Sequence, residues 1–117
     1  MKIIFISLFF FTQIHAENIM HVWKSPSCMC CEDWIKYLEE NKFKVIKHNS
    51  GNTMIKEKLG IDESLSSCHT GIIDRYLIEG HVPIKDIKKL LNLRPKNAIG
   101  LSVPEMQIGS PGIDKHS

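Results

Sequence analysis

Three of the four cysteines in this chain fall within four residues. Cys28 and the pair Cys30 and Cys31 form one group, and Cys68 lies far downstream with His69 attached. Thiolates are soft ligands and imidazole is borderline, so a pocket that joins them suits Cu(I) or Zn(II) far better than Ca²⁺ or Mg²⁺. The grouping predicts a metal site rather than a catalytic centre. Its candidate ligands are Cys28, Cys30, Cys31, Cys68 and His69.

The two metals would use these donors differently. Zn(II) takes four ligands in a tetrahedron, which Cys28, Cys31, Cys68 and His69 would supply. Cu(I) accepts two or three soft donors, and an extra thiolate from Cys30 suits ligand-by-ligand transfer to a partner. Cys30 adjoins Cys31, however, and a regular helix would point it away from the others. Spacing alone therefore leaves both Cu(I) and Zn(II) open.

Two other classes of function use the same cysteines. In a thiol-disulfide oxidoreductase, Cys28 would be the exposed nucleophile and Cys31 the resolving thiol. In a small interaction domain, the four cysteines would form two disulfides or hold a structural zinc. We keep both as alternatives to a metal carrier, which would break no bond in a substrate.

The remaining sulfur and imidazole groups are weaker candidates. Met29 is more typical of a packing or exposed residue, and Met106 of a hydrophobic contact. His81 lies just before Pro83, where a histidine more often stabilises the start of a helix than binds a metal. The other histidines are too scattered along the sequence to group: His21, His48 and His116.

The N-terminus has the parts of a secretory signal peptide. Lys2 precedes a short apolar run that ends in a more polar segment closed by Ala16. Residues 1–16 are therefore predicted to be removed, which leaves residues 17–117 as a single small domain, periplasmic or secreted. No later segment is apolar enough to span a membrane. The net charge of +2 is too small for a nucleic-acid-binding surface.

The elements that must position the cysteines follow from the apolar pattern. Residues 19–24 and 43–48 are predicted strands, and 70–73 with 76–79 a hairpin. One helix begins at the cysteine cluster and buries Cys31, Trp34, Ile35 and Leu38, and it stops near Asn41. Further helices are predicted over 53–59 and after Pro83. Residues 94–117 are predicted to be an irregular tail that packs partly on the domain. The expected order is β-α-β-α-β-β-α, a small mixed sheet.

This order, with a Cys-x-x-Cys pair at the start of the first helix, resembles the thioredoxin fold. Several motifs, which span nearly the whole predicted mature chain, also resemble the bacterial family known as domain of unknown function 411. They are Cys28-Met29-Cys30-Cys31 with Trp34, Ser67-Cys68-His69-Thr70, Ile78-Glu79-Gly80-His81-Val82-Pro83, and Val103-Pro104 with Gly109-Ser110-Pro111-Gly112. The chain departs from the family pattern at Met29, where glycine is common, and at Ile113, where methionine is frequent.

The resemblance implies a function in copper handling in the bacterial envelope. It favours Cu(I) over Zn(II), sequestration or delivery as the mechanism, and a copper-transport or copper-storage protein as partner. In thioredoxin-like proteins, the segment before the third strand faces the Cys-x-x-Cys and normally carries a cis proline. Here Cys68 and His69 stand in that place, so the resemblance implies that they complete the metal site.

Overall fold

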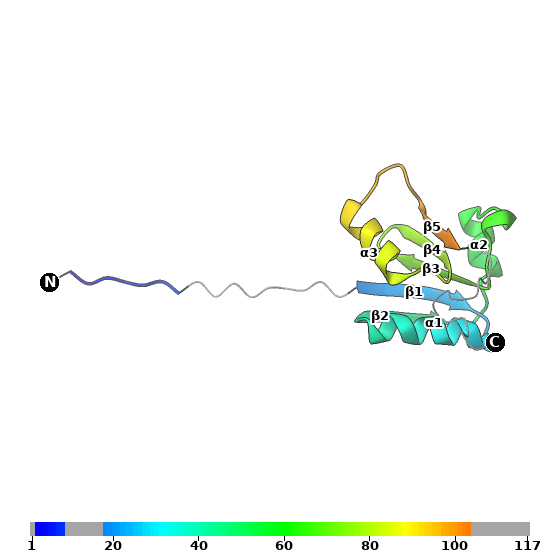
Figure 1. Cartoon of the computed structure of the whole chain (residues 1–117), viewed down its shortest axis with the longest axis horizontal. Coiled ribbons are helices and arrows are strands. Elements are labelled where there is room, and N and C mark those ends of the chain that lie inside the picture. The colour runs from blue at the N-terminus through cyan, green and yellow to red at the C-terminus, as the bar shows by residue number, and fades with distance from the viewer. Residues whose placement is uncertain (1, 9–17, 104–117) are drawn as a thin grey trace.

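The computed structural model describes residues 2–8 and 18–103. Within the second range, one mixed sheet has the strand order β2-β1-β3-β4-β5 (Figure 1). β1 (Asn18–Lys24) pairs parallel with β2 (Phe43–His48) and antiparallel with β3 (His69–Ile73). β3 pairs antiparallel with β4 (Tyr76–Gly80), and β4 pairs parallel with β5 (Gly100–Val103). Three α-helices, α1 (Met29–Glu40), α2 (Thr53–Leu59) and α3 (Ile84–Leu93), complete the fold with a 3₁₀ turn, η1 (Glu63–Leu65).

Helix α1 begins at the cysteine cluster. Its apolar residues recur three and four positions apart, so they share one face of the helix. The buried residues of α1 are the four predicted from the sequence: Cys31, Trp34, Ile35 and Leu38. Trp34, Ile35 and Leu38 pack with the inward side chains of β1 and with α3 in a single hydrophobic core. The helix ends at Glu40, and Lys42 then takes a left-handed conformation with φ 68° before β2 begins. This packing fixes the start of α1 against one end of the sheet.

The predicted hairpin is confirmed, with Asp74 and Arg75 as its turn. Asp74 adopts φ 53°, a left-handed conformation that aspartate tolerates better than most residues. The helix predicted after Pro83 is α3, which buries Ile84, Ile87 and Leu90. Together these elements give the predicted β-α-β-α-β-β-α order of a mixed α/β domain.

The prediction of an irregular segment over 94–117 was wrong at Gly100–Val103, which forms β5. These four residues lack a strong strand pattern, and the open edge of β4 provides the hydrogen-bonding partner that makes them a strand. Leu101 and Val103 pack against the core, as expected for the apolar members of this segment. The remainder of the predicted tail, residues 104–117, lies outside the described residues.

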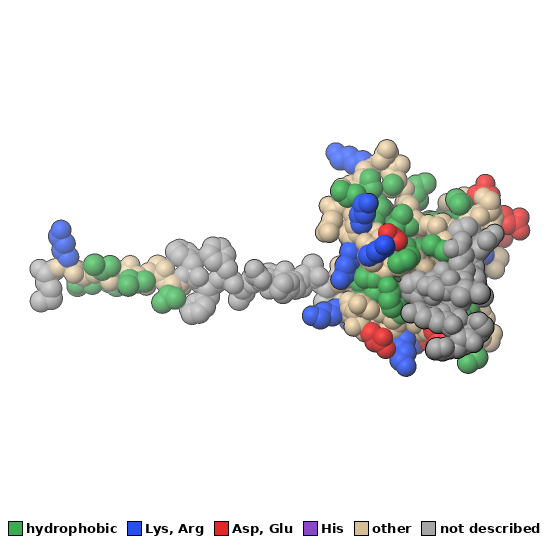
Figure 2. All heavy atoms as spheres, viewed as in Figure 1, with side chains coloured by type: hydrophobic (Ala, Val, Ile, Leu, Met, Phe, Trp, Pro, Cys, Tyr) green, Lys and Arg blue, Asp and Glu red, His purple; other side chains and the backbone are tan. Residues whose placement is uncertain are grey.

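Three observations outside the cysteine cluster bear on function. Residues 2–8 form neither helix nor strand, and their large apolar side chains are 74–89% exposed. None of the described helices is long and apolar enough to cross a membrane. In the view of Figure 2, the described Lys and Arg side chains are spread among apolar and polar ones rather than gathered into one patch.

Candidate metal centre

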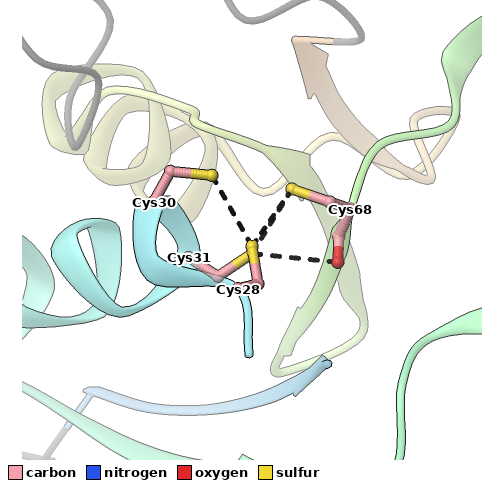
Figure 3. Close-up of side chains that lie close together, drawn as sticks. All are labelled: Cys28, Cys30, Cys31 and Cys68. Atoms are coloured by element: carbon pink, nitrogen blue, oxygen red, sulfur yellow. Dashed lines mark hydrogen bonds between the residues drawn. A yellow bond between two sulfur atoms is a disulfide. The ribbon is translucent and has the colours of Figure 1, made fainter. Parts of the chain in front are cut away.

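The structure brings all four cysteines together at the start of α1 (Figure 3). Sγ of Cys68 lies 3.3 Å from Sγ of Cys31 and 3.7 Å from Sγ of Cys28. Sγ of Cys30 lies 3.5 Å from Sγ of Cys28, and the four sulfurs are all within 4.8 Å of one another. Two sulfurs bound to one tetrahedral ion at 2.3 Å would be about 3.8 Å apart. The observed separations therefore lie close to those of a shared soft ion.

Cys28 and Cys31 are joined by a disulfide, whereas Cys30 and Cys68 lie outside it. A disulfide sulfur is a poor ligand compared with a thiolate. Reduction by two electrons and two protons opens the bond and places four thiols around one point. The disulfide form and the four-thiol form are thus two redox states of the same group of residues.

Cys30 lies with the other cysteines, although a regular helix spacing would have pointed it away from them. Cys30 is in the first turn of α1, but Cys28 is the N-cap residue, with extended backbone angles of φ −80° and ψ 96°. Because Cys28 stands outside the regular helix, helical spacing does not govern its position relative to Cys30. Cys31 is fully buried, Cys28 and Cys30 are half-buried, and Cys68 is exposed, so the group opens to solvent on one side.

His69 is the first residue of β3 and is fully buried beside Cys68. Its Nε2 is 2.7 Å from the carbonyl oxygen of Gly80, so Nε2 carries the proton and donates it to that oxygen. Burial, reinforced by the charge of His81, lowers the pKa of His69 to about 4 despite this hydrogen bond. The ring is therefore neutral at pH 7, and its Nδ1, which lies 3.9 Å from Sγ of Cys68, keeps a lone pair. This is the tautomer that binds metals.

Trp34 holds this histidine in place from α1. Its ring stacks on His69 with a centroid distance of 4.4 Å, and its Nε1 donates to the carbonyl oxygen of Val82 over 3.1 Å. His81 is also buried, and its ring meets that of His69 edge-on with centroids 4.8 Å apart. Cys68, His69 and His81 bring ligand atoms within 4.8 Å of one another. The sequence interpretation gave His81 little weight, but the structure places it beside the predicted site.

The loop that carries Cys68 is fixed by a buried polar network that sequence reasoning missed. The Glu79 carboxylate accepts hydrogen bonds from the Thr70 hydroxyl, at 2.7 Å from Oε2, and from the backbone N–H and hydroxyl of Ser67. The Asn52 side chain donates to Thr70 Oγ1 and to the Ser67 carbonyl. Burial raises the pKa of Glu79, and these hydrogen bonds oppose the rise. The network holds Ser67 and Thr70, which flank Cys68 and His69.

A buried cation lies at the same end of the sheet. Lys24 is fully buried at the end of β1, where its backbone is paired with His69. Its Nζ is 2.6 Å from Oε1 of Glu32 in the first turn of α1, and its hydrogen bond is the main cause of the lowered pKa of Glu32. Alternation with the inward residues Met20 and Val22 is the sequence signal that would have placed Lys24 inside. This ion pair ties α1 to the strand beneath it.

Other sequence candidates divide between those the structure describes and those it does not. Met29 is 82% exposed and is the first residue of α1, next to the cysteines in sequence. Met106 and His116 lie outside the described residues. His21 and His48, which seemed scattered, are neighbours in space because the strands that carry them pair in parallel. Parallel register is the signal that would have joined them.

Comparisons with known proteins found similar solved structures and a matching family. Two solved structures of copper resistance protein CopG are 43% identical to this chain. Form 2 gives a TM-score of 0.78 over 85% of this chain and 79% of that protein, and form 1 gives 0.77 over 85% and 78%. A comparison with curated protein sequences returned no match. The family described as "Protein of unknown function, DUF411" matches residues 65–113, which include Cys68, His69 and the hairpin. With this match and these relatives, the chain belongs to the DUF411 family.

Proposed function

We propose that this protein binds Cu(I) through its cysteine group and sequesters or delivers it in copper homeostasis. The observation that carries the proposal is the convergence of four sulfurs from two distant segments within 4.8 Å of one another. The copper-resistance name of relatives that are 43% identical supports copper over zinc. Cys28, Cys30, Cys31 and Cys68 are the proposed thiolate ligands, and Nδ1 of His69 is the proposed nitrogen ligand.

The electrostatics of the group also favour a cation. Partial desolvation of the Cys68 thiol, followed by the negative charge of Cys30, raises its pKa to about 11. Several thiolates in one half-buried group repel one another; a bound cation displaces the thiol protons, and its positive charge offsets the repulsion between the thiolates that result. Cys68 therefore stays a thiol well above neutral pH, and a thiol is a poor nucleophile. This argues against nucleophilic attack by Cys68 itself.

Loading begins from the reduced protein. Two cellular thiols, or one dithiol, supply two electrons and two protons to open Cys28–Cys31 and are themselves oxidised to a disulfide; Cu(I) then displaces protons from the thiols that bind it. Occupancy protects the ligated thiolates from forming a disulfide again. Release follows when thiolates or thioethers of a copper-transport or copper-storage partner replace these ligands one at a time, on the side where Cys68 is exposed.

The wider setting is part of the same proposal. The β-α-β unit followed by a hairpin and α3, with the Cys28–Cys31 pair at the start of α1, supports a thioredoxin-like fold. Residues 1–16 act as a signal peptide, and the protein functions in the periplasm or outside the cell. The exposed apolar side chains of residues 2–8 support this role, because they bury no surface against the folded domain and so do not stabilise it.

A second candidate, thiol-disulfide exchange, is favoured by one observation. The Cys28–Cys31 disulfide lies at a helix N-terminus, where the macrodipole stabilises a departing thiolate. An oxidoreductase of this kind would reduce insulin with turnover and would retain that activity after Cys68→Ser. A Cu(I) carrier would show no turnover.

The test is anaerobic Cu(I) competition against a chromogenic chelator, using reduced full-length protein. We expect Cys68→Ser to weaken Cu(I) binding at least tenfold, because it removes the donor that joins the two segments. Met29→Leu is the matched control, since it lies in the same motif and replaces an exposed thioether, and it should bind like the wild type. Equal affinity of Cys68→Ser and wild type would refute the proposed ligand set.

A further inference from the structure

A pair of histidines lies on the opposite face of the sheet from the cysteine group. Side chains alternate along β1, so Met20, Val22 and Lys24 are buried on the α1 side, whereas His21 and Trp23 point to the other side. His48 ends β2, and its backbone is paired with Trp23 in the parallel register. Figure 1 shows β1 and β2 side by side at this edge. Both histidines are only partly buried.

The two imidazoles meet directly. Nδ1 of His21 is 2.9 Å from Nε2 of His48, with the rings 17° from parallel. Trp23 stacks on His48 with a centroid distance of 4.5 Å and an angle of 11° between the rings. The stack restricts the His48 ring, and the strand pairing fixes the two backbones. The nitrogens are therefore held together before any ligand arrives.

This separation matches a metal-binding pair. Two nitrogens at about 2.0 Å from one ion and at right angles to each other are about 2.8 Å apart. Imidazole suits Cu(II) and Zn(II); the stability order of divalent ions, together with a nitrogen–nitrogen separation that fits a right angle at the ion, favours Cu(II). Lys47, the nearest basic residue in β2, points to the other face and is paired with Glu32 at 3.3 Å. Its charge is thus directed away from the histidines.

We propose that His21 and His48 form a second metal site, for Cu(II), with water completing the coordination. The proton shared between the rings leaves its nitrogen when Cu(II) binds, and that ring takes up a proton at its other nitrogen. The pair binds as neutral imidazoles, and no redox change is needed. This site uses other residues and another oxidation state than the cysteine group, so it does not depend on the Cu(I) proposal.

The test uses full-length protein in the disulfide form, with the remaining thiols alkylated so that they do not reduce or bind Cu(II). Cu(II) is titrated against glycine as competitor and followed by electron paramagnetic resonance and by Trp fluorescence. The wild type should show nitrogen hyperfine coupling and quenching of the Trp23 emission. His21→Gln and His48→Gln should each weaken binding at least tenfold, and the double variant should lose little more than either single one.

The control is Lys44→Gln, a change on the same face of β2 that should leave Cu(II) binding unaltered. Unchanged affinity and coupling in both histidine variants would overturn the proposal. If His48→Gln fails to fold because the Trp23 stack is lost, His21→Gln alone decides the matter, since His21 is less involved in stacking. Cu(I) competition with reduced His21→Gln should match the wild type, so a failure here is distinguishable from a failure at the cysteines.

Discussion

The neutral state of buried His69 makes the stability of the metal-free protein depend on pH. Its pKa is lowered from 6.5 in the unfolded chain to about 4 in the folded one, chiefly by burial. Between these values the unfolded chain binds a proton that the folded protein rejects. Stability is therefore fully present above pH 7 and is lost as pH falls toward 4. At 1.36 kcal/mol per pKa unit, the loss is about 3 kcal/mol.

The matched variant is His69→Gln, whose amide can still donate to the Gly80 carbonyl but does not titrate. Urea unfolding of both proteins in the disulfide form, at pH values from 7 to 4, gives the free energy of unfolding at each pH. Other groups titrate in the same range, so the informative quantity is the difference between the two proteins. We expect the wild type to lose about 3 kcal/mol more than His69→Gln. Parallel curves would refute the assignment of a buried, neutral His69.

Two further predictions concern the backbone and the network that position Cys68 and His69. Gly80→Ala should destabilise the protein by about 2 kcal/mol in urea unfolding, because Gly80 has φ 85° and an added Cβ would collide with the Val103 carbonyl oxygen; an unchanged midpoint would contradict this. Thr70→Val removes the buried hydroxyl bound to Glu79 and should cost about 2 kcal/mol. It should also weaken Cu(I) binding, and full affinity in the folded variant would show that the network does not position Cys68.

The sequence was most informative where local patterns and global packing agree. The three- and four-residue spacing from Cys31 to Leu38 marked the buried face of α1, and the helix predicted over 53–59 has the bounds of α2. The grouping of Cys68 with the N-terminal cysteines was a hypothesis from residue types, and only the resemblance to the thioredoxin fold gave a reason for the two segments to meet. Local sequence patterns do not indicate which distant segments come into contact, because those contacts form only when the chain folds.

The features that sequence reasoning missed depend on such contacts. β5 forms because the edge of β4 offers backbone groups for hydrogen bonding, and the sequence of residues 100–103 does not by itself predict a strand. Glu79 looks like a solvent-facing strand residue, yet it is buried because Ser67 and Thr70 provide hydrogen bonds. Cys30 was a candidate ligand, but its contact with Cys28 arises because the helix starts between them. In each case, the deciding partner is remote in sequence or lies at an element boundary.

In the proposed copper form, the cysteine sulfurs bind one copper ion in common. Copper K-edge X-ray absorption on anaerobically reduced wild-type protein, loaded with one equivalent of Cu(I), counts these sulfurs. We expect an edge typical of Cu(I) and a first shell of two or three sulfurs, with fewer sulfurs in Cys68→Ser. A first shell of nitrogen and oxygen only, or a sulfur count unchanged by Cys68→Ser, would contradict it.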